Sequence, residues 1–463
     1  MPIATVNPAT GETLKTYDAL GAEEIEQRLE RAADAFAEHR TTSLEHRSRL
    51  LSRAADLLEE DAEDAARTVT LEMGKPLTAA RAETAKCVKA MRWYAAHAAE
   101  ELADEHPRPE DVADSGAARA VVRYRPLGPV LAVMPWNFPL WQVIRFAAPA
   151  LMAGNVGLLK HASNVPQTAL YLEDLFRRAG YRAGCFQTLL IGSDAVAGIL
   201  RDPRIAAATV TGSEEAGRSV ASIAGDVVKK TVLELGGSDP YLVLPSADLD
   251  RAARTAVTAR VQNNGQSCIA AKRFLVHADV HEDFTRRFVR AMTSLAVGDP
   301  MDERTEVGPL AVERGRQTLE ELVEEARRQG AELLCGGGRP ENHTRGWFFE
   351  PTVLSGVTPA MRIHREETFG PVAALYRVSG LDEALSLANA TSFGLSSNVW
   401  TRDEEEMDRC ARDLEAGGVY FNGMTASHPG LPFGGVKHSG YGRELSGHGM
   451  REFCNTTTLW YGP

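Results

Sequence analysis

A thiol and an upstream carboxylate are the residues of this sequence whose types could together do chemistry. Cys268 lies in the segment NNGQSCIAA at 263–271, and Glu234 lies in LELGG at 233–237. A thiolate attacks carbonyl carbon readily, and a carboxylate that activates water would release the resulting acyl group as an acid. The two residues therefore suggest acyl transfer. Most free cysteines are small buried hydrophobic residues, so the alternative is a core cysteine without a chemical role.

Polar residues that follow predicted buried strands form a second group of candidates. Short apolar runs alternate with helix-like segments after residue 119, which is typical of an open parallel sheet. Ligands of such sheets bind beyond the carboxyl ends of the strands. The predicted strands are 129–134, 155–159, 186–191 and 207–210, and the polar residues at or just beyond their ends are Trp136, Asn137, Lys160, Gly192 and 211–213.

A glycine turn, TGSEEAG at 211–217, is the only short phosphate-binding candidate. Its backbone N–H groups, at the start of a predicted helix, could bind a pyrophosphate, although an ordinary strand-to-helix turn has the same composition. The sequence lacks G-x-G-x-x-G, G-x-x-x-x-G-K-[ST], H-E-x-x-H and G-x-S-x-G. Ordinary dinucleotide-binding, P-loop, zinc-protease and α/β-hydrolase assignments are therefore not supported.

The remaining elements place this chemistry in a cleft between two domains. Helical periodicity over about the first 110 residues predicts a helical layer, whose many charged residues we interpret as solvated faces. Strands and acidic amphipathic helices after residue 240 predict a second α/β domain, and the cleft between the domains is the expected site. The helices are predicted near 25–36, 50–58, 77–102 and 316–329, and the second set of strands near 241–244, 272–276, 331–334 and 372–376.

Composition excludes several classes of function. The chain has 463 residues, enough for two or three domains, and a net charge of −12 that disfavours nucleic acid. Its six cysteines show no C-x-x-C spacing, which argues against a zinc site or a disulfide framework. No export signal or apolar run long enough for a membrane span is present. We expect a cytoplasmic protein without a metal or a membrane partner.

Taken together, the motifs resemble those of the aldehyde dehydrogenases, in the same order and over essentially the whole chain. The resemblance implies an α/β fold with a Rossmann-like cofactor-binding domain, a second α/β catalytic domain and a β oligomerisation arm. The motifs are PWNFP at 135–139, the Lys160 segment, TGS at 211–213, LELGG at 233–237, GQSC at 265–268, ETFGP at 367–371 and PFGG at 432–435. The expected boundaries are 1–118 and 127–235 for the cofactor-binding domain, 236–430 for the catalytic domain, 119–126 and 450–463 for the arm, and 431–449 for a return to the cofactor-binding domain.

The resemblance also implies a mechanism. Cys268 would attack an aldehyde, and the Asn137 amide with the Cys268 backbone N–H would hold the oxyanion. Hydride would leave to the nicotinamide, and Glu234 would activate the water that hydrolyses the thioester. Coenzyme-A-acylating relatives generally lack this glutamate, so water is the expected acyl acceptor.

Cofactor residues follow from the same resemblance. Glu367 would hold the nicotinamide ribose, with Phe369 against the ring region. Members that prefer NAD commonly carry a glutamate where this chain has Ser163, and with Lys160 beside it the serine favours the 2′-phosphate of NADP, NAD remaining possible. The other expected cofactor contacts are Trp136, Gly212, Ser213, Gly217 and Leu235.

The substrate class is inferred from Arg145. An arginine between Ile144 and Phe146 requires a partner, and the resemblance to succinate-semialdehyde dehydrogenases, where an arginine at this position binds the substrate carboxylate, suggests one. An internal salt bridge is the alternative. Trp141 and Ser427 resemble further substrate contacts of that branch, whereas Gln262 stands where several members have a second arginine. We therefore expect a succinate semialdehyde substrate, with glutarate semialdehyde or a broad range of aliphatic aldehydes as alternatives.

Other functions and the assembly are also considered. A structural protein without catalysis would have lost Cys268, Glu234 or Asn137, and none is lost; a thiol esterase would not reduce a cofactor. The edge strands expected at 120–125 and 456–460 resemble an arm that pairs with a neighbouring subunit. A homodimer is the first expectation and a homotetramer the second.

Overall fold

The chain begins with a β-hairpin, which periodicity does not predict, and continues with a helical layer. The structure, a computed structural model, describes residues 2–462. The predicted helices at 25–36, 50–58 and 77–102 are confirmed, apart from boundaries. The elements are β1 (Ile3–Val6), β2 (Thr13–Tyr17), α1 (Ala22–His39), α2 (Leu44–Glu60), α3 (Ala62–Met73), α4 (Leu77–Glu101) and α5 (Pro109–Asp114).

Charged residues of this helical layer are not all solvated, contrary to the expectation from sequence. Glu72 is fully buried, and its carboxylate accepts hydrogen bonds from Thr5 and from the backbone N–H of Thr168. Arg47 and Glu83 are buried as well. Each is compensated by backbone groups of later segments, a tertiary relationship that helical periodicity cannot reveal.

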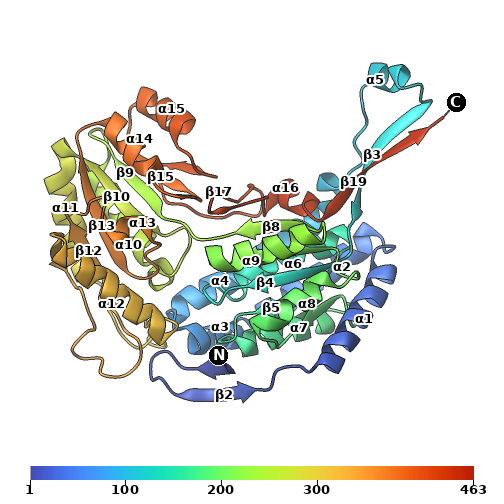
Figure 1. Cartoon of the computed structure of the whole chain (residues 1–463), viewed down its shortest axis with the longest axis horizontal. Helices are drawn as coiled ribbons and strands as arrows, with labels where there is room; N and C mark the ends of the chain where they lie inside the picture. Colours follow the sequence, from blue (N-terminus) through green and yellow to red (C-terminus); the bar gives the residue numbers. More distant parts are fainter. Residues whose placement is uncertain (1, 463) are drawn as a thin grey trace.

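The first sheet has the order β18-β8-β7-β4-β5-β6 and is parallel except for β18. The chain runs from β4 outward through β5 and β6, then returns to the other side of β4 with β7 and β8 (Figure 1). The carboxyl ends of β4 and β7 therefore form a topological switch point, where ligands of such sheets bind. The strands are β4 (Pro129–Met134), β5 (Val156–His161), β6 (Phe186–Thr188), β7 (Ala207–Thr211), β8 (Lys230–Glu234) and β18 (Gly440–Tyr441), with helices α6 (Trp141–Ala153), α7 (Pro166–Arg178), α8 (Val196–Arg201), α9 (Glu214–Asp226) and α16 (Ser446–Arg451).

The second sheet has the order β11-β12-β13-β10-β9-β15-β16 and forms the other lobe (Figure 1). Four of its strands are predicted from sequence; β12, β15 and β16, of three or four residues each, are not. The strands are β9 (Asp239–Val243), β10 (Ala271–His277), β11 (Glu332–Cys335), β12 (Thr352–Ser355), β13 (Val372–Val378), β15 (Ser397–Trp400) and β16 (Val419–Phe421). The helices are α10 (Leu249–Val261), α11 (Ala278–Thr293), α12 (Glu313–Arg328), α13 (Arg362–Arg365), α14 (Leu381–Asn389) and α15 (Glu404–Asp413), and a small pair joins β14 (Phe393–Gly394) to β17 (Val436–Lys437).

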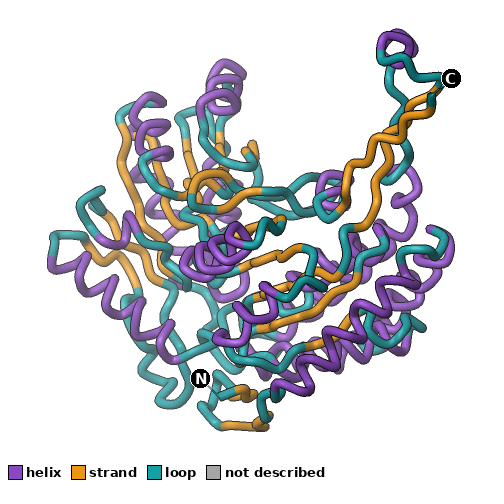
Figure 2. Tube along the Cα trace, turned by 45° about the vertical axis from the view of Figure 1, so that its right-hand side comes forward, coloured by secondary structure: helices purple, strands orange, loops and turns teal. Residues whose placement is uncertain are grey.

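A two-stranded ribbon projects from the body of the molecule (Figures 1 and 2). It pairs β3 (Arg119–Pro126) with β19 (Cys454–Tyr461) in antiparallel register over the full length of both strands. The two predicted edge strands therefore pair with each other, and Trp460 and Tyr461 are exposed. Residues 1 and 463, the outer limits of the expected domain boundaries, lie outside the described residues.

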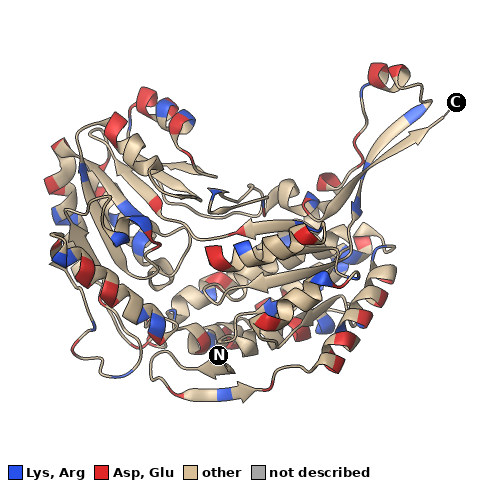
Figure 3. Ribbon diagram, viewed as in Figure 1, with Lys and Arg blue, Asp and Glu red and all other residues tan. Residues whose placement is uncertain are grey.

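Three general properties of the described chain bear on its partners. Figure 3 shows acidic and basic residues interspersed along the outer helices α12 and α15. Within residues 2–462, no helix is both long and apolar enough to cross a membrane. Over the same range, no three His, Cys, Asp or Glu side chains are grouped to hold a metal ion.

Candidate active site

Cys268 lies in a tightly shaped loop between α10 and β10. Asn263 and Asn264 have φ of 56° and 58°, and a Cβ on Gly265 would lie 2.3 Å from the Gly370 backbone. Asparagine and glycine tolerate this left-handed conformation best, which explains the NNG sequence before the thiol. These three residues therefore set the path of the backbone toward Cys268.

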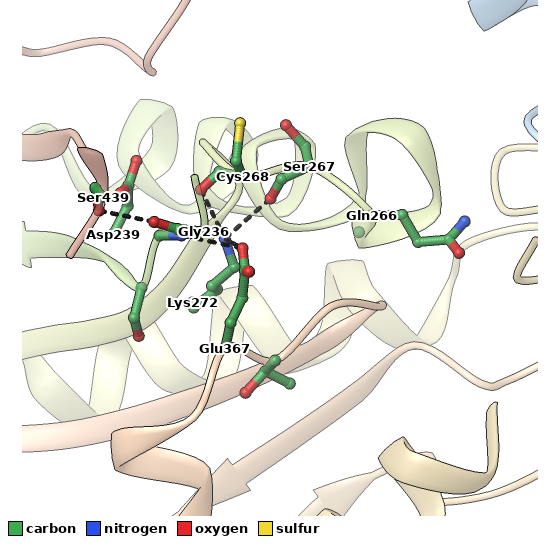
Figure 4. Close-up of polar contacts among 12 residues, drawn as sticks. Gly236, Asp239, Gln266, Ser267, Cys268, Lys272, Glu367 and Ser439 are labelled. Carbon is green, nitrogen blue, oxygen red and sulfur yellow. Dashed lines mark hydrogen bonds and ion pairs between the residues drawn. The ribbon is translucent and has the colours of Figure 1, made fainter. Parts of the chain in front are cut away.

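Lys272 holds the backbone of this loop. Its Nζ donates to the carbonyl oxygens of Ser267 and Cys268 at 2.9 and 2.8 Å and lies 3.3 Å from Oε1 of Glu367. In Figure 4 the Cys268 sulfur points away from these contacts. Lys272 was not predicted from sequence, although a lysine near the start of a predicted strand, shortly after Cys268, was an available signal. It orients the loop while the sulfur is left free.

One cavity of about 280 Å³ brings most of the predicted residues together. It contains all three predicted catalytic residues and six of the predicted cofactor residues. It lies at the carboxyl ends of β4, β7 and β8, where the sheet topology places a ligand. Its lining is Pro135, Trp136, Asn137, Thr211, Gly212, Ser213, Glu234, Leu235, Gly236, Cys268, Glu367 and Phe369.

Burial controls the protonation of the thiol and the carboxyl group. It raises the pKa of Cys268 to about 12, against the opposing effect of Arg145 and Lys272. Burial also raises the pKa of Glu234, whose two oxygens have no hydrogen-bond partner among the described residues. Burial thus favours the neutral form of both groups, and each is a stronger base once ionised. An unpartnered carboxyl group in a cavity is free to bond a water or a reacting group.

Asn137 is fixed beside the cysteine loop. Its side-chain Nδ2 donates to the backbone carbonyl of Gln266 at 3.1 Å, which leaves the second N–H of the amide available. The backbone carbonyl of Asn137 accepts from Nδ2 of Asn263 at 2.7 Å. The segment that follows is held by Glu83 of α4, which accepts from the N–H groups of Leu140 and Trp141, both at 2.9 Å. A rigid amide donor next to a thiol can stabilise an oxyanion.

The turn between β7 and α9 has the features of an anion-binding helix start. Ser213 caps α9, its Oγ accepting from the N–H of Ala216 at 3.2 Å. A Cβ on Gly217 would lie 2.6 Å from Leu235, so this glycine permits close packing of the helix. A Cβ on Gly212 would meet nothing closer than 4.0 Å, so this turn is open toward the cavity. The N–H groups in the first turn of α9 can donate hydrogen bonds to a phosphate.

Glu367 and Phe369 also line this cavity. The Glu367 carboxylate accepts from the N–H of Gly237 at 3.1 Å as well as pairing with Lys272. The rings of Phe369 and Trp136 meet edge to face, with centroids 5.7 Å apart. A carboxylate and an apolar ring at the cavity wall suit a ribose and a planar heterocycle.

Lys160 and Ser163 lie outside the cavity lining, near the carboxyl end of β5. Burial lowers the pKa of Lys160, and within residues 2–462 no carboxylate pairs with it. The Ser163 carbonyl accepts from the N–H of Ala4 at 3.0 Å, which fixes the turn that follows the strand. A largely buried lysine without an acidic partner is suited to an anionic ligand.

Arg145 does not occupy the position that the sequence interpretation requires. It is 2% exposed, does not line the cavity, and forms an ion pair with Glu444. Its guanidinium also donates to Thr211 at 3.4 Å and lies over Phe433 at 5.0 Å. The internal salt bridge, the alternative considered from sequence, is therefore what the structure contains. Glu444 supplies the anion, so Arg145 has no need of a substrate carboxylate.

Trp141 and Ser427 are brought together by a residue that sequence reasoning missed. Lys86 of α4 donates to Oγ of Ser427 at 2.6 Å, and its Nζ lies 4.2 Å from the centroid of the Trp141 ring. We call Lys86, Trp141 and Ser427 the lysine cluster. Gln262 also lacks a partner, since its Nε2 makes no hydrogen bond to the described residues.

These features are those of an aldehyde dehydrogenase. The aldehyde dehydrogenase family model matches residues 1–459, and the chain belongs to this family. It is 60% identical to succinate-semialdehyde dehydrogenase [NADP(+)] 1 of Mycobacterium tuberculosis, over 99% of this chain and 100% of the relative. It is 59% identical to the Mycobacterium avium succinate-semialdehyde dehydrogenase [NADP(+)], over 100% of this chain and 97% of the relative. The crystal structure of the Streptococcus pyogenes succinic semialdehyde dehydrogenase in complex with NADP+ is similar, with a TM-score of 0.95, 35% identity and 100% coverage of both chains.

Proposed function

We propose that this chain oxidises succinate semialdehyde to succinate, with NADP as the hydride acceptor. The observation that carries the proposal is the single cavity that joins Cys268, Glu234 and Asn137 to the start of α9. The substrate and cofactor follow the names of the Mycobacterium relatives. Oxidation of glutarate semialdehyde or of uncharged aldehydes is the alternative.

The residues of the chain have distinct tasks in this reaction. Cys268, once ionised, forms the bond to the aldehyde carbon. The second side-chain N–H of Asn137 donates a hydrogen bond to the resulting oxyanion. Glu234 takes a proton from the water that hydrolyses the acyl group on Cys268, so the product is an acid. The raised pKa of Glu234 suits this task, because a buried carboxylate is a stronger base than an exposed one.

The cofactor residues present fit NADP. The capped start of α9, with Ser213 and Gly212 at the cavity, is suited to the pyrophosphate, and Glu367 to the nicotinamide ribose. Lys160, which pairs with no carboxylate of residues 2–462, suits a 2′-phosphate, with Ser163 in place of an acid. When bound, this cofactor supplies the acceptor for the hydride.

A matrix of kcat/KM values tests the proposal. Succinate semialdehyde, glutarate semialdehyde and butanal are each combined with NADP and NAD, and the reduced cofactor is followed by absorbance. We expect the highest value for succinate semialdehyde with NADP, and no turnover with Cys268→Ala. A flat profile across the three aldehydes, or a preference for NAD, would contradict the corresponding part of the proposal.

The proposal includes a cytoplasmic homodimer, with a homotetramer as the second choice. The projecting β3–β19 ribbon, with its exposed Trp460 and Tyr461, supports it, because a free sheet edge is suited to pairing with another subunit. Light scattering on the full chain and on a variant truncated after residue 453 measures the assembly. If the truncated variant forms an oligomer with the same number of subunits as the full chain, the ribbon has no role in pairing the subunits.

A further inference from the structure

Lys86 points toward the start of α6 because of its place on α4. It follows Glu83 by three residues, and side chains three apart share one face of a helix. Glu83 is bonded to the N–H groups of Leu140 and Trp141, so this face of α4 is turned toward the start of α6. Lys86 accordingly extends over the Trp141 ring rather than into solvent.

Lys86 is largely buried and lacks an acidic partner. Within residues 2–462 it forms no ion pair; its polar contact is the Ser427 hydroxyl at 2.6 Å. Arg145 repels it, whereas Cys87, the Glu83 carboxylate and Cys268 attract it, so the lysine lies within electrostatic reach of the nucleophile. A desolvated cation without a counter-ion is costly, which indicates that an anion completes its environment in a functional state.

We propose that Lys86 determines substrate selectivity by binding the distal carboxylate of the semialdehyde, together with the hydroxyl of Ser427. The inference deepens the proposed function and rests on it for the identity of the substrate. Arg145 is already neutralised by Glu444, so Lys86 is the cation available to a second anion near Cys268. The Trp141 indole beneath the ammonium would pack against the methylene groups of such a substrate.

A purely structural role for Lys86 explains the contacts less well. A lysine that only filled space between α4 and the Ser427 loop would be expected to reach solvent or a carboxylate. Here the ammonium ends on a neutral hydroxyl and an aromatic ring, two groups that reduce but do not cancel its charge. The remaining donor capacity of the ammonium can be used by a carboxylate.

Steady-state kinetics of the full enzyme with NADP test the role of Lys86. Butanal has the length of succinate semialdehyde with a methyl group in place of the carboxylate. We expect Lys86→Met to raise KM for succinate semialdehyde about 10- to 100-fold and to leave kcat/KM for butanal within about twofold, as for the loss of one charge-assisted hydrogen bond. Lys86→Arg should retain most of the preference. Lys89→Met, on an exposed position of the same helix, is the matched control.

Inhibition by succinate gives a second measurement that does not depend on the proposed substrate. Succinate should inhibit butanal oxidation competitively in the wild type and in Lys89→Met, and at least tenfold more weakly in Lys86→Met. Equal inhibition of all three, or none in the wild type, would overturn the role of Lys86. A wild type that is inhibited by succinate but prefers butanal to succinate semialdehyde would overturn the proposed function alone. Turnover of butanal shows that each variant is folded.

Discussion

Two regions near Cys268 each contain a buried cation, and they treat it differently. In the first, which we call the buried ion cluster, Arg145 lies with Glu234 and Glu444, and Glu444 pairs with it directly. In the second, the lysine cluster, Lys86 contacts the Ser427 hydroxyl and an aromatic ring and forms no ion pair within residues 2–462. A cation that is neutralised inside the protein contributes to structure and to the properties of its neighbours. A cation without an acidic partner is available to a ligand.

The difference predicts different kinetic consequences. Changes in the buried ion cluster should alter folding stability or the rate of acyl release, because its groups surround Glu234. Changes in the lysine cluster should alter the affinity for a charged substrate and little else. Four measurements test this division, and the strongest response is expected at Glu234.

Glu234→Gln should separate acyl formation from acyl release. Loss of the general base is expected to lower steady-state turnover by about 10²- to 10⁴-fold. A burst of reduced cofactor, one equivalent per site, should persist, because Cys268 still reacts. Rapid mixing measures the burst, mass spectrometry detects the acyl group on Cys268, and Cys268→Ala is the control without a burst. A folded variant that loses the burst as well would place Glu234 in the first step.

Arg145→Met should destabilise the protein. Glu444 would be left buried without its counter-ion, at a cost of about 3–5 kcal/mol in the free energy of unfolding. Thermal and urea denaturation measure the loss, and adding Glu444→Gln should restore part of it. Lys86→Met, which removes an uncompensated charge, should leave stability unchanged or increase it. If Arg145→Met kept full stability and only raised KM for succinate semialdehyde, Arg145 would be the substrate anchor after all.

The pH profile should differ between charged and uncharged aldehydes. For both substrates kcat/KM should rise with pH, because burial raises the pKa of Cys268 to about 12 and the thiolate reacts. Burial lowers the pKa of Lys86 to about 8, with Arg145, Cys87, Glu83 and Cys268 as the other charged or titratable groups acting on it. Lys86 is a cation below this pKa and loses its charge above it. The succinate semialdehyde profile should therefore level or fall above about pH 8, while that of butanal continues to rise.

Substitution by arginine gives the control for this profile. Lys86→Arg stays charged throughout, so the difference between the two substrates should disappear above pH 8. Identical wild-type pH profiles for both aldehydes would contradict the proposal that loss of the Lys86 charge limits succinate semialdehyde oxidation at alkaline pH.

Ser427→Ala should have the smallest effect. The hydroxyl contributes one hydrogen bond to the lysine cluster, so KM for succinate semialdehyde should rise about 3- to 10-fold, corresponding to about 0.7–1.4 kcal/mol. Initial rates with butanal should not change. An equal loss for both aldehydes would indicate that Ser427 supports the loop rather than the substrate.

The sequence was sufficient for the family, the two sheets and most of the cavity lining. Local motifs carry Cys268, Glu234 and Asn137, because each requires a particular backbone around it. The lysine cluster and the partner of Arg145 were not predictable in this way. Lys86 meets a residue 341 positions away, and Arg145 meets Glu444 near the other end of the chain. Such pairs depend on how helices pack, which composition and periodicity do not specify.

Helix α4 places the residue that positions the reaction centre and the residue proposed to select the substrate at two different positions. Glu83 holds the segment after Asn137 through backbone N–H groups, and this bond does not depend on the side chains of that segment. One turn later, Lys86 contacts no catalytic side chain directly. A descendant of this protein could therefore acquire a new aldehyde by exchanging the residue at position 86 alone. The inherited fold supplies a fixed reaction centre and, beside it, one position that is free to evolve.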